Sequence, residues 1–208
     1  MACGVICVSH TTGSGGDEVG KRVADRLGYL YVDEEIVARA AAQGGLEPRD
    51  IADEERRRSF ARRTLEALAE GGGDALTLGA PIAATMEGLR PADVRALIRE
   101  TVVQTAARGN VVIVAHAASH ALEPSSRALR VFVTSSPATR AGRVGAAEGL
   151  DEARAARAIK DADLGRRDYL KRFYSVGDET PTDYDLVINT DLLSTEQAAE
   201  IVLQAADR

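Results

Sequence analysis

The chain has 208 residues, of which 45% are hydrophobic and 28% are charged, the composition of an ordinary soluble globular protein. Its net charge of −6 argues against a general nucleic-acid or membrane-surface binder, because such proteins carry a basic excess. The first ten residues, MACGVICVSH, have no basic start and no long apolar run, so we expect no signal peptide or membrane span and a cytoplasmic location.

The N-terminal segment carries both cysteines of the chain, Cys3 and Cys7. On an extended strand, two residues four positions apart lie about 13 Å from each other, which is beyond the reach of a disulfide. We therefore interpret both as small buried hydrophobic residues rather than as redox or metal-binding groups.

Strand and helix signals alternate along the chain. Short apolar runs predict buried strands at Val5–Val8, Tyr29–Asp33, Val111–Val114, Leu129–Val133 and Leu186–Ile188. Helices are expected at 17–28, at 34–42, at about 48–70, from Pro91 to Gly109, from Pro137, at 151–174 as one helix or a helix pair, and from Ser194. This alternation is typical of an α/β fold with a parallel sheet covered on both faces, and the first strand is expected to be central.

We expect the whole chain, residues 1–208, to form a single domain. The helical stretch at about 45–90 looks like an insertion after the second strand rather than an independent domain. The long helical stretch at about 151–174 is the second feature that departs from a plain strand–helix repeat.

A glycine-rich turn, Thr12-Gly13-Ser14-Gly15-Gly16, separates the first strand from the first helix. Glycines allow the backbone to approach an anion, and the helix dipole adds positive charge at that point, so the arrangement favours phosphate binding. A tight turn that merely requires glycine is the alternative. The usual pattern G-x-x-x-x-G-K-[ST] is incomplete, because Gly16, Asp17 or Glu18 occupies the positions of the lysine and hydroxyl.

The segment Ser9–Val19 resembles the first loop of the cytidylate kinase-like family, S-R-x-x-G-S-G-G-R-E-I, which also lacks the lysine. Later segments are similar to that family in the same order: Gly28–Asp33, Val111–Val114, Arg130–Val133 with Pro137 and Glu148-Gly149, Asp163–Tyr174, and Tyr184–Thr190 with Leu193-Ser194. The resemblance implies a three-layer P-loop NTPase fold, with a five-stranded parallel sheet and a helical lid at about 151–174. It also implies a kinase that transfers the γ-phosphoryl of ATP, with Mg²⁺, to CMP, dCMP or a related nucleoside monophosphate.

The resemblance implies a donor-phosphate site and a set of catalytic cations. The donor phosphates would bind at Gly13, Ser14, Gly15, Gly16 and Asp17. The arginines that would surround the phosphates or stack on the donor base are Arg140, Arg143, Arg166 and Arg172. The alternative for each arginine is a solvated basic face balanced by Asp161, Asp163 and Asp168.

The acceptor nucleotide would be bound by Asp33, Arg39 and His116. Each has an alternative: Asp33 could cap the following helix, Arg39 could lie on the surface, and His116 could be a semi-buried structural histidine. We assign no metal ligand, because a zinc site at His116 and His120 would need further ligands.

Four positions where the family carries arginine hold other residues in this chain: His10, Asp17, His116 and Leu164. Each lowers the positive charge near phosphate, and at an effective dielectric of about 20 an acid about 5 Å from a phosphate charge opposes it by roughly 3 kcal/mol. Two other functions therefore stay open: a catalytically weak or inactive protein that binds a nucleotide or a partner, and a P-loop phosphotransferase for another small metabolite. We expect small-molecule nucleotides as partners, and no nucleic acid or membrane; a homodimer is left open.

Overall fold

The computed structural model describes residues 3–33, 91–115, 118–122, 124–125 and 127–207. The helices expected at 34–42 and at about 48–70, and the insertion at about 45–90, lie outside the described residues.

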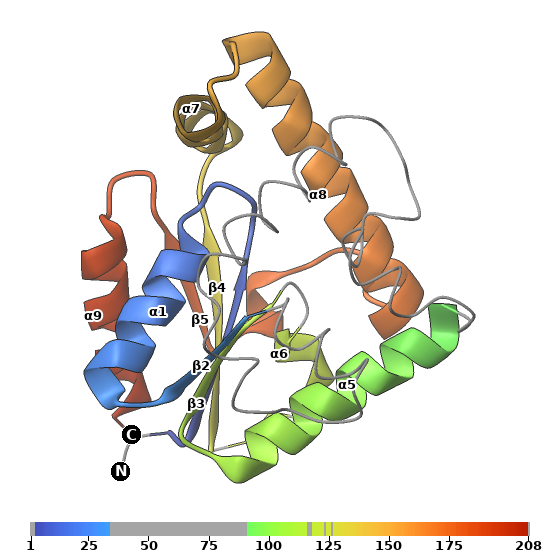
Figure 1. Ribbon diagram of the computed structural model, residues 1–208, viewed down its shortest axis with the longest axis vertical. Helices are drawn as coiled ribbons and strands as arrows, with labels where there is room; N and C mark the ends of the chain where they lie inside the picture. The colour runs from blue at the N-terminus through green and yellow to red at the C-terminus, as the bar shows by residue number, and fades with distance from the viewer. Residues whose placement is uncertain (1–2, 34–90, 116–117, 123, 126, 208) are drawn as a thin grey trace.

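The centre of the molecule is a five-stranded parallel sheet (Figure 1). Its strands are β1 (Val5–His10), β2 (Leu30–Asp33), β3 (Val111–Val114), β4 (Ala128–Thr134) and β5 (Leu186–Asn189), in the order β2-β3-β1-β4-β5. Every neighbouring pair is parallel. The predicted central place of β1 is confirmed by this order, and all its residues are buried, as expected for an apolar strand that is covered on both faces.

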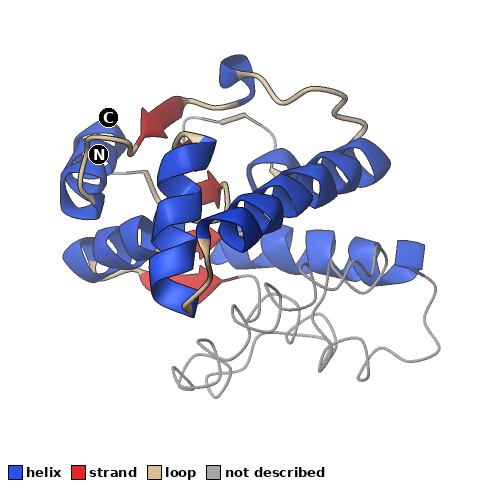
Figure 2. Ribbon diagram, turned by 90° about the horizontal axis from the view of Figure 1, so that it is seen from above, coloured by secondary structure: helices blue, strands red, loops and turns tan. Residues whose placement is uncertain are grey.

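Helices cover both faces of the sheet, which gives the three layers predicted from the sequence (Figures 1 and 2). On one face, α1 (Gly16–Leu27) and α9 (Thr195–Ala206) pack on alternate side chains of the central strands, such as Ile6 and Val8. On the other face, α5 (Pro91–Arg108) and the short α6 (Ala118–Ala121) pack on the intervening residues, such as Cys7. The side-chain alternation of the strands thus builds two separate cores.

The two helices that follow β4, α7 (Pro137–Glu148) and α8 (Glu152–Tyr174), pack on each other beyond the sheet. Their boundaries follow from capping: Ser136 and Asp151 each accept a backbone N–H of the first turn, and Gly149 ends α7 in a left-handed conformation. The second helix is continuous over 23 residues, so the expected stretch 151–174 is one helix rather than a pair. A short 3₁₀ helix, η3 (Pro181–Asp183), then leads into β5.

Both cysteines are free and buried, as predicted, and burial raises the pKa of Cys7 to about 12. No helix in the described part of the chain has the length and apolar character needed to cross a membrane. Strands β1, β4 and β5 are longer than predicted, and β1 continues through Ser9 and His10, which pair with Phe132 and Val133 of β4. Polar side chains at these positions ended the apolar runs in the sequence but do not interrupt the backbone ladder.

Candidate functional site

The glycine-rich loop leaves the carboxyl end of the central strand and opens helix α1. Gly13 and Gly15 have φ angles of 80° and 83°, in the left-handed region that favours glycine. A Cβ on Gly15 would lie 2.8 Å from Cγ2 of Thr195, and one on Gly16 would lie 2.2 Å from Cβ of His10. The loop therefore requires glycine for its backbone geometry and for its close packing, beyond what an ordinary turn needs.

Ser14 anchors this loop to the sheet. Its side chain is buried, and its Oγ donates hydrogen bonds to the carbonyl oxygens of Thr11 at 2.7 Å and Val133 at 3.0 Å. Its backbone N–H also donates to the Thr11 carbonyl, at 3.1 Å. Ser14, predicted as a phosphate-binding residue, therefore shapes the loop from within.

His10 and Asp17 form a pair across the glycine loop. Nε2 of His10 lies 3.3 Å from Oδ1 of Asp17, whose side chain is 69% exposed while that of His10 is 9% exposed. Burial of His10 lowers its pKa and the charge of Arg166 acts in the same direction, but the charge and hydrogen bond of Asp17, with the Thr11 carbonyl, raise the pKa above its usual value. Asp17 is therefore paired with a histidine whose charge depends on pH.

Arg140 connects α7 and α8 to the loop. Its guanidinium is buried and donates to the Asp163 carboxylate through Nη1 at 2.8 Å and Nη2 at 2.7 Å. Nε donates to the carbonyl of Ser135 at 3.0 Å, and Nη1 also approaches the carbonyl of Thr12 at 3.4 Å. The predicted balance of an α7 arginine by Asp163 is therefore present, but as a buried bidentate pair rather than a solvated face.

Arg143, one turn later on α7, contacts carbonyl oxygens of the glycine loop. Its Nη2 donates to the Thr190 carbonyl at 2.6 Å, and its Nη1 lies 3.4 Å from the carbonyl oxygens of both Gly13 and Ser14. The Thr190 hydroxyl in turn donates to the Ser14 carbonyl at 2.8 Å. Arg143 is exposed, in contrast to the buried Arg140.

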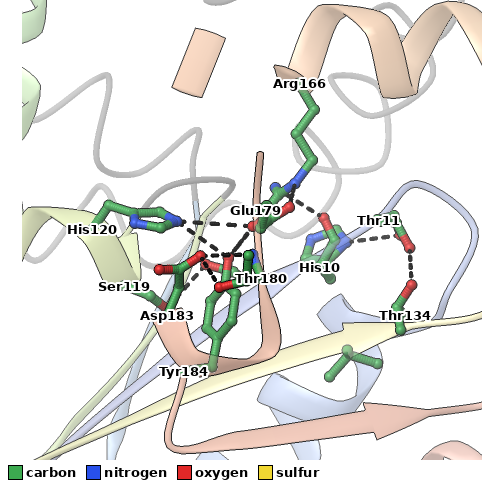
Figure 3. A network of polar contacts seen from close by, with 12 residues as sticks. His10, Thr11, Ser119, His120, Thr134, Arg166, Glu179, Thr180, Asp183 and Tyr184 are labelled. Carbon is green, nitrogen blue, oxygen red and sulfur yellow. Dashed lines mark hydrogen bonds and ion pairs between the residues drawn. The ribbon is translucent and has the colours of Figure 1, made fainter. Parts of the chain in front are cut away.

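Arg166 points from α8 toward the start of the loop, where it is buried (Figure 3). It donates to the Glu179 carboxylate through Nε at 2.9 Å and Nη2 at 2.5 Å, and Nη1 donates to the His10 carbonyl at 3.3 Å. Its Cζ also lies 5.3 Å from the centroid of the Phe132 ring. Arg166 was predicted to surround the phosphates or stack on the donor base. The structure places its guanidinium against the His10 carbonyl, just before the glycine loop.

Three residues of this cluster were not predicted as site residues: Glu179, Tyr184 and His120. The Tyr184 hydroxyl donates a short hydrogen bond to Glu179 and lies 3.3 Å from Nε2 of His120. Burial would raise the pKa of Glu179, but hydrogen bonds and charge from His120, Arg166 and Tyr184 lower it to about 2. The sequence offers little indication of the role of Glu179, because this residue lies in the connection between α8 and η3, outside any recognised motif.

The predicted acceptor residues are only partly covered by the described residues. Asp33 is half-buried at the end of β2, in register with Val114 of β3, so it does lie at the carboxyl edge of the sheet. Arg39 and His116 lie outside the described residues, and so does the side chain of Arg172, whose backbone is part of α8. The acceptor roles of these residues stay predictions.

Comparison with known proteins places this geometry in a family. The fold is similar to that of an uncharacterized protein from Eubacterium ventriosum, with 17% identity, a TM-score of 0.68 and 98% of each chain covered. It is also similar to shikimate kinase from Bacteroides thetaiotaomicron, with 16% identity, a TM-score of 0.53 and 98% of each chain covered. These likenesses establish the P-loop kinase fold, and no curated protein matches the chain. The model of the cytidylate kinase-like family matches residues 5–192, and the chain belongs to that family.

Proposed function

We propose that the protein is a nucleoside-monophosphate kinase that transfers the γ-phosphoryl of ATP, with Mg²⁺, to CMP, dCMP or a related acceptor. The observation that carries this proposal is the glycine loop: it opens α1 at the carboxyl end of the central strand, Arg140 and Arg143 contact its carbonyl oxygens, and Arg166 contacts the His10 carbonyl just before it. Membership of the cytidylate kinase-like family supports the reaction type and the acceptor class.

The residues of the loop fit a nucleotide phosphate. Carbonyl oxygens of the segment from His10 to Ser14 accept hydrogen bonds from Arg166, Arg140 and Arg143. These contacts fix the carbonyl side of the loop, so the backbone amides at the N-terminus of α1 and the helix dipole are available to an anion on the other side. A loop held in this way needs little rearrangement when charge develops on the transferring group.

The three arginines have different roles in this proposal. Arg140 and Arg166 are buried in bidentate pairs with Asp163 and Glu179, and we assign them to positioning the loop. Arg143 has no such carboxylate pair among the described residues and is exposed, so of the three arginines it is the one that a donor nucleotide can reach. Leu192, two residues after the Thr190 that Arg143 contacts, is 97% exposed and would give the donor base an apolar surface.

Magnesium, when bound, neutralises phosphate charge and is usually held by one or two carboxylates together with phosphate oxygens. In the described ranges, no group of three or more His, Cys, Asp or Glu residues gathers to hold a metal ion.

A second function is favoured by one observation. His10 and Asp17 stand where the resembled loop carries arginines, and they lie 3.3 Å from each other, so this loop lacks the two permanent positive charges of the family pattern. A protein that binds a nucleotide without efficient transfer would be consistent with that exchange.

The test is a phosphoryl-transfer assay with ATP, Mg²⁺ and a panel of CMP, dCMP, UMP and AMP, read by chromatography of the diphosphate product, beside calorimetric binding of each nucleotide. A kinase converts CMP or dCMP, and Arg143→Gln lowers kcat/KM by at least about tenfold, because a charged donor at phosphate contributes more than a neutral one. Arg157→Gln, which changes an 80% exposed arginine of α8, is the matched control and should be neutral. Binding of ATP without product selects the second function, and absence of both binding and product refutes the proposal.

A further inference from the structure

The side chain of Arg166 is fixed from several directions at once (Figure 3). The Nε and Nη2 edge faces the Glu179 carboxylate, the Tyr184 hydroxyl lies 3.3 Å from Nη2, and the Phe132 ring lies under the guanidinium. That ring is itself stacked on Tyr184, with centroids 4.9 Å apart and an interplanar angle of 13°. The remaining edge, Nη1, is directed to the His10 carbonyl, which is the last carbonyl of β1 before the glycine loop.

The Glu179 carboxylate also has contacts with several groups besides Arg166. Its side chain is 17% exposed, and it accepts from both Arg166 and Tyr184. His120, on α6, approaches the same carboxylate, with Nε2 3.8 Å from Oε1. The carboxylate therefore connects three parts of the structure: helix α8, helix α6 and the segment that enters β5.

We propose that Glu179 is a positioning residue of the phosphate site, and that it acts by holding Arg166 against the His10 carbonyl at the root of the glycine loop. This inference rests on the proposed function for its catalytic consequence, although its structural part does not. Without the carboxylate, the buried guanidinium would lose its bidentate partner and rotate toward solvent or toward another acceptor. The loop would then lose its support on the carbonyl side of His10.

The alternative is an ion pair that only stabilises the fold, and a neighbouring pair offers a matched control. Asp185 is bonded to Arg130 by Nη2 at 3.0 Å and by the Arg130 backbone N–H at 2.8 Å. Both carboxylates belong to the segment that enters β5, and both arginines are largely buried, with side chains 6% exposed for Arg166 and 14% for Arg130. Arg130 lies at mid-strand in β4, in register with Cys7, away from the glycine loop.

The experiment compares Glu179→Gln and Glu179→Asp with Asp185→Asn. The first readout, which needs no ligand, is hydrogen exchange of the amides of residues 11–16, after each variant has been shown to be folded by its circular dichroism. We expect Glu179→Gln to speed exchange in this loop by at least about tenfold relative to Asp185→Asn, with Glu179→Asp in between, because local opening is governed by the contacts that are lost. Equal loop exchange in Glu179→Gln and Asp185→Asn would overturn the proposal.

The second readout is kcat and KM with ATP, Mg²⁺ and CMP. Glu179→Gln should lower kcat more than it raises KM, toward the loss of about 100-fold that a misplacement of about 1 Å can cause. Asp185→Asn should keep the wild-type kcat, and Glu179→Asp should recover part of it. A kcat unchanged in Glu179→Gln would overturn the catalytic part of the inference. If the wild type binds no nucleotide but loop exchange responds as expected, the proposed function is wrong and the positioning role of Glu179 stands.

Discussion

His10 and Asp17 face each other across the glycine loop, with 3.3 Å between the imidazole Nε2 and the carboxylate Oδ1. Gly16 lies directly against the same imidazole, since a Cβ there would come within 2.2 Å of the His10 Cβ. His10 and Asp17, the two residues that distinguish this loop from the one it resembles, therefore interact electrostatically. When His10 is protonated, its positive charge partly neutralises the Asp17 carboxylate.

Asp17→Arg should increase the affinity for ATP. The substitution replaces a negative charge by a positive one at the N-terminus of α1, but the side chain is 69% exposed and solvent screens the gain, so we expect about tenfold tighter binding. Calorimetry with and without Mg²⁺ measures it, and Arg22→Gln, at an exposed ion pair on the same helix, is the control. Weaker binding that appears only with Mg²⁺ would instead identify Asp17 as a metal ligand.

The His10–Asp17 pair also predicts a pH dependence of stability. Because the folded-state pKa of His10 is raised, the stabilisation is complete below the unfolded value of 6.5 and is lost as the pH rises through the folded pKa. The free energy of unfolding should therefore fall with pH above 6.5 in the wild type more than in His10→Gln or Asp17→Asn. Urea unfolding between about pH 5 and pH 9 measures this difference, and identical curves for the wild type and His10→Gln would exclude the pair as its source.

Arg140 and Asp163 should show strong energetic coupling. The bidentate pair joins α7 to α8, and its arginine side chain is only 4% exposed. In a double-mutant cycle of Arg140→Gln and Asp163→Asn, we expect a coupling energy of about 1–3 kcal/mol in the free energy of unfolding. The exposed pair Arg26–Glu200 gives the comparison cycle, for which a coupling below about 1 kcal/mol is expected. Equal coupling in the two cycles would contradict a structural role for Arg140.

Two glycines offer a test of packing on the α1 face. A Cβ on Gly20 would lie 2.3 Å from Cγ2 of Val114, so Gly20→Ala should destabilise the protein by about 1–3 kcal/mol. Gly142, on α7, has no atom within 4 Å of an added Cβ, and Gly142→Ala should stabilise by roughly 0.5–1 kcal/mol, the usual preference of a helix for alanine. Thermal unfolding of both variants measures the contrast. Destabilisation of the two by the same amount would show that the α1–β3 contact is looser than described.

The sheet could be predicted from the sequence because its strands are short apolar runs, buried on both faces, with glycines at the turns. The central place of Val5–Val8 and the single glycine loop after it followed from that pattern. The helix α6 was not predicted, because four residues are too few to show a helical period. The 3₁₀ turn η3 was missed for the same reason.

The partners of the arginines could not be predicted. Arg166 was matched with aspartates of its own helix, but its carboxylate is Glu179, 13 residues later and beyond the end of α8. Tyr184 and His120, which both contact that carboxylate, also contact each other although they are 64 residues apart, and only the fold brings them together. Helical spacing identified the arginines as a group, whereas which of them are buried depends on tertiary packing.

Calorimetric titration with ATP and Mg²⁺ tests the central claim, that the lysine-less glycine loop is the donor-phosphate site. The informative comparison is the wild type, Gly15→Ala and the control Gly142→Ala, because Gly15 has a left-handed φ in the loop whereas Gly142 lies within α7. A non-glycine residue in that conformation costs roughly 1–2 kcal/mol, and 1.4 kcal/mol corresponds to about a tenfold change in affinity. We predict that the wild type and Gly142→Ala bind ATP equally and that Gly15→Ala binds it about tenfold more weakly or not at all. Equal affinity in all three proteins, or no ATP binding by the wild type, would contradict the claim.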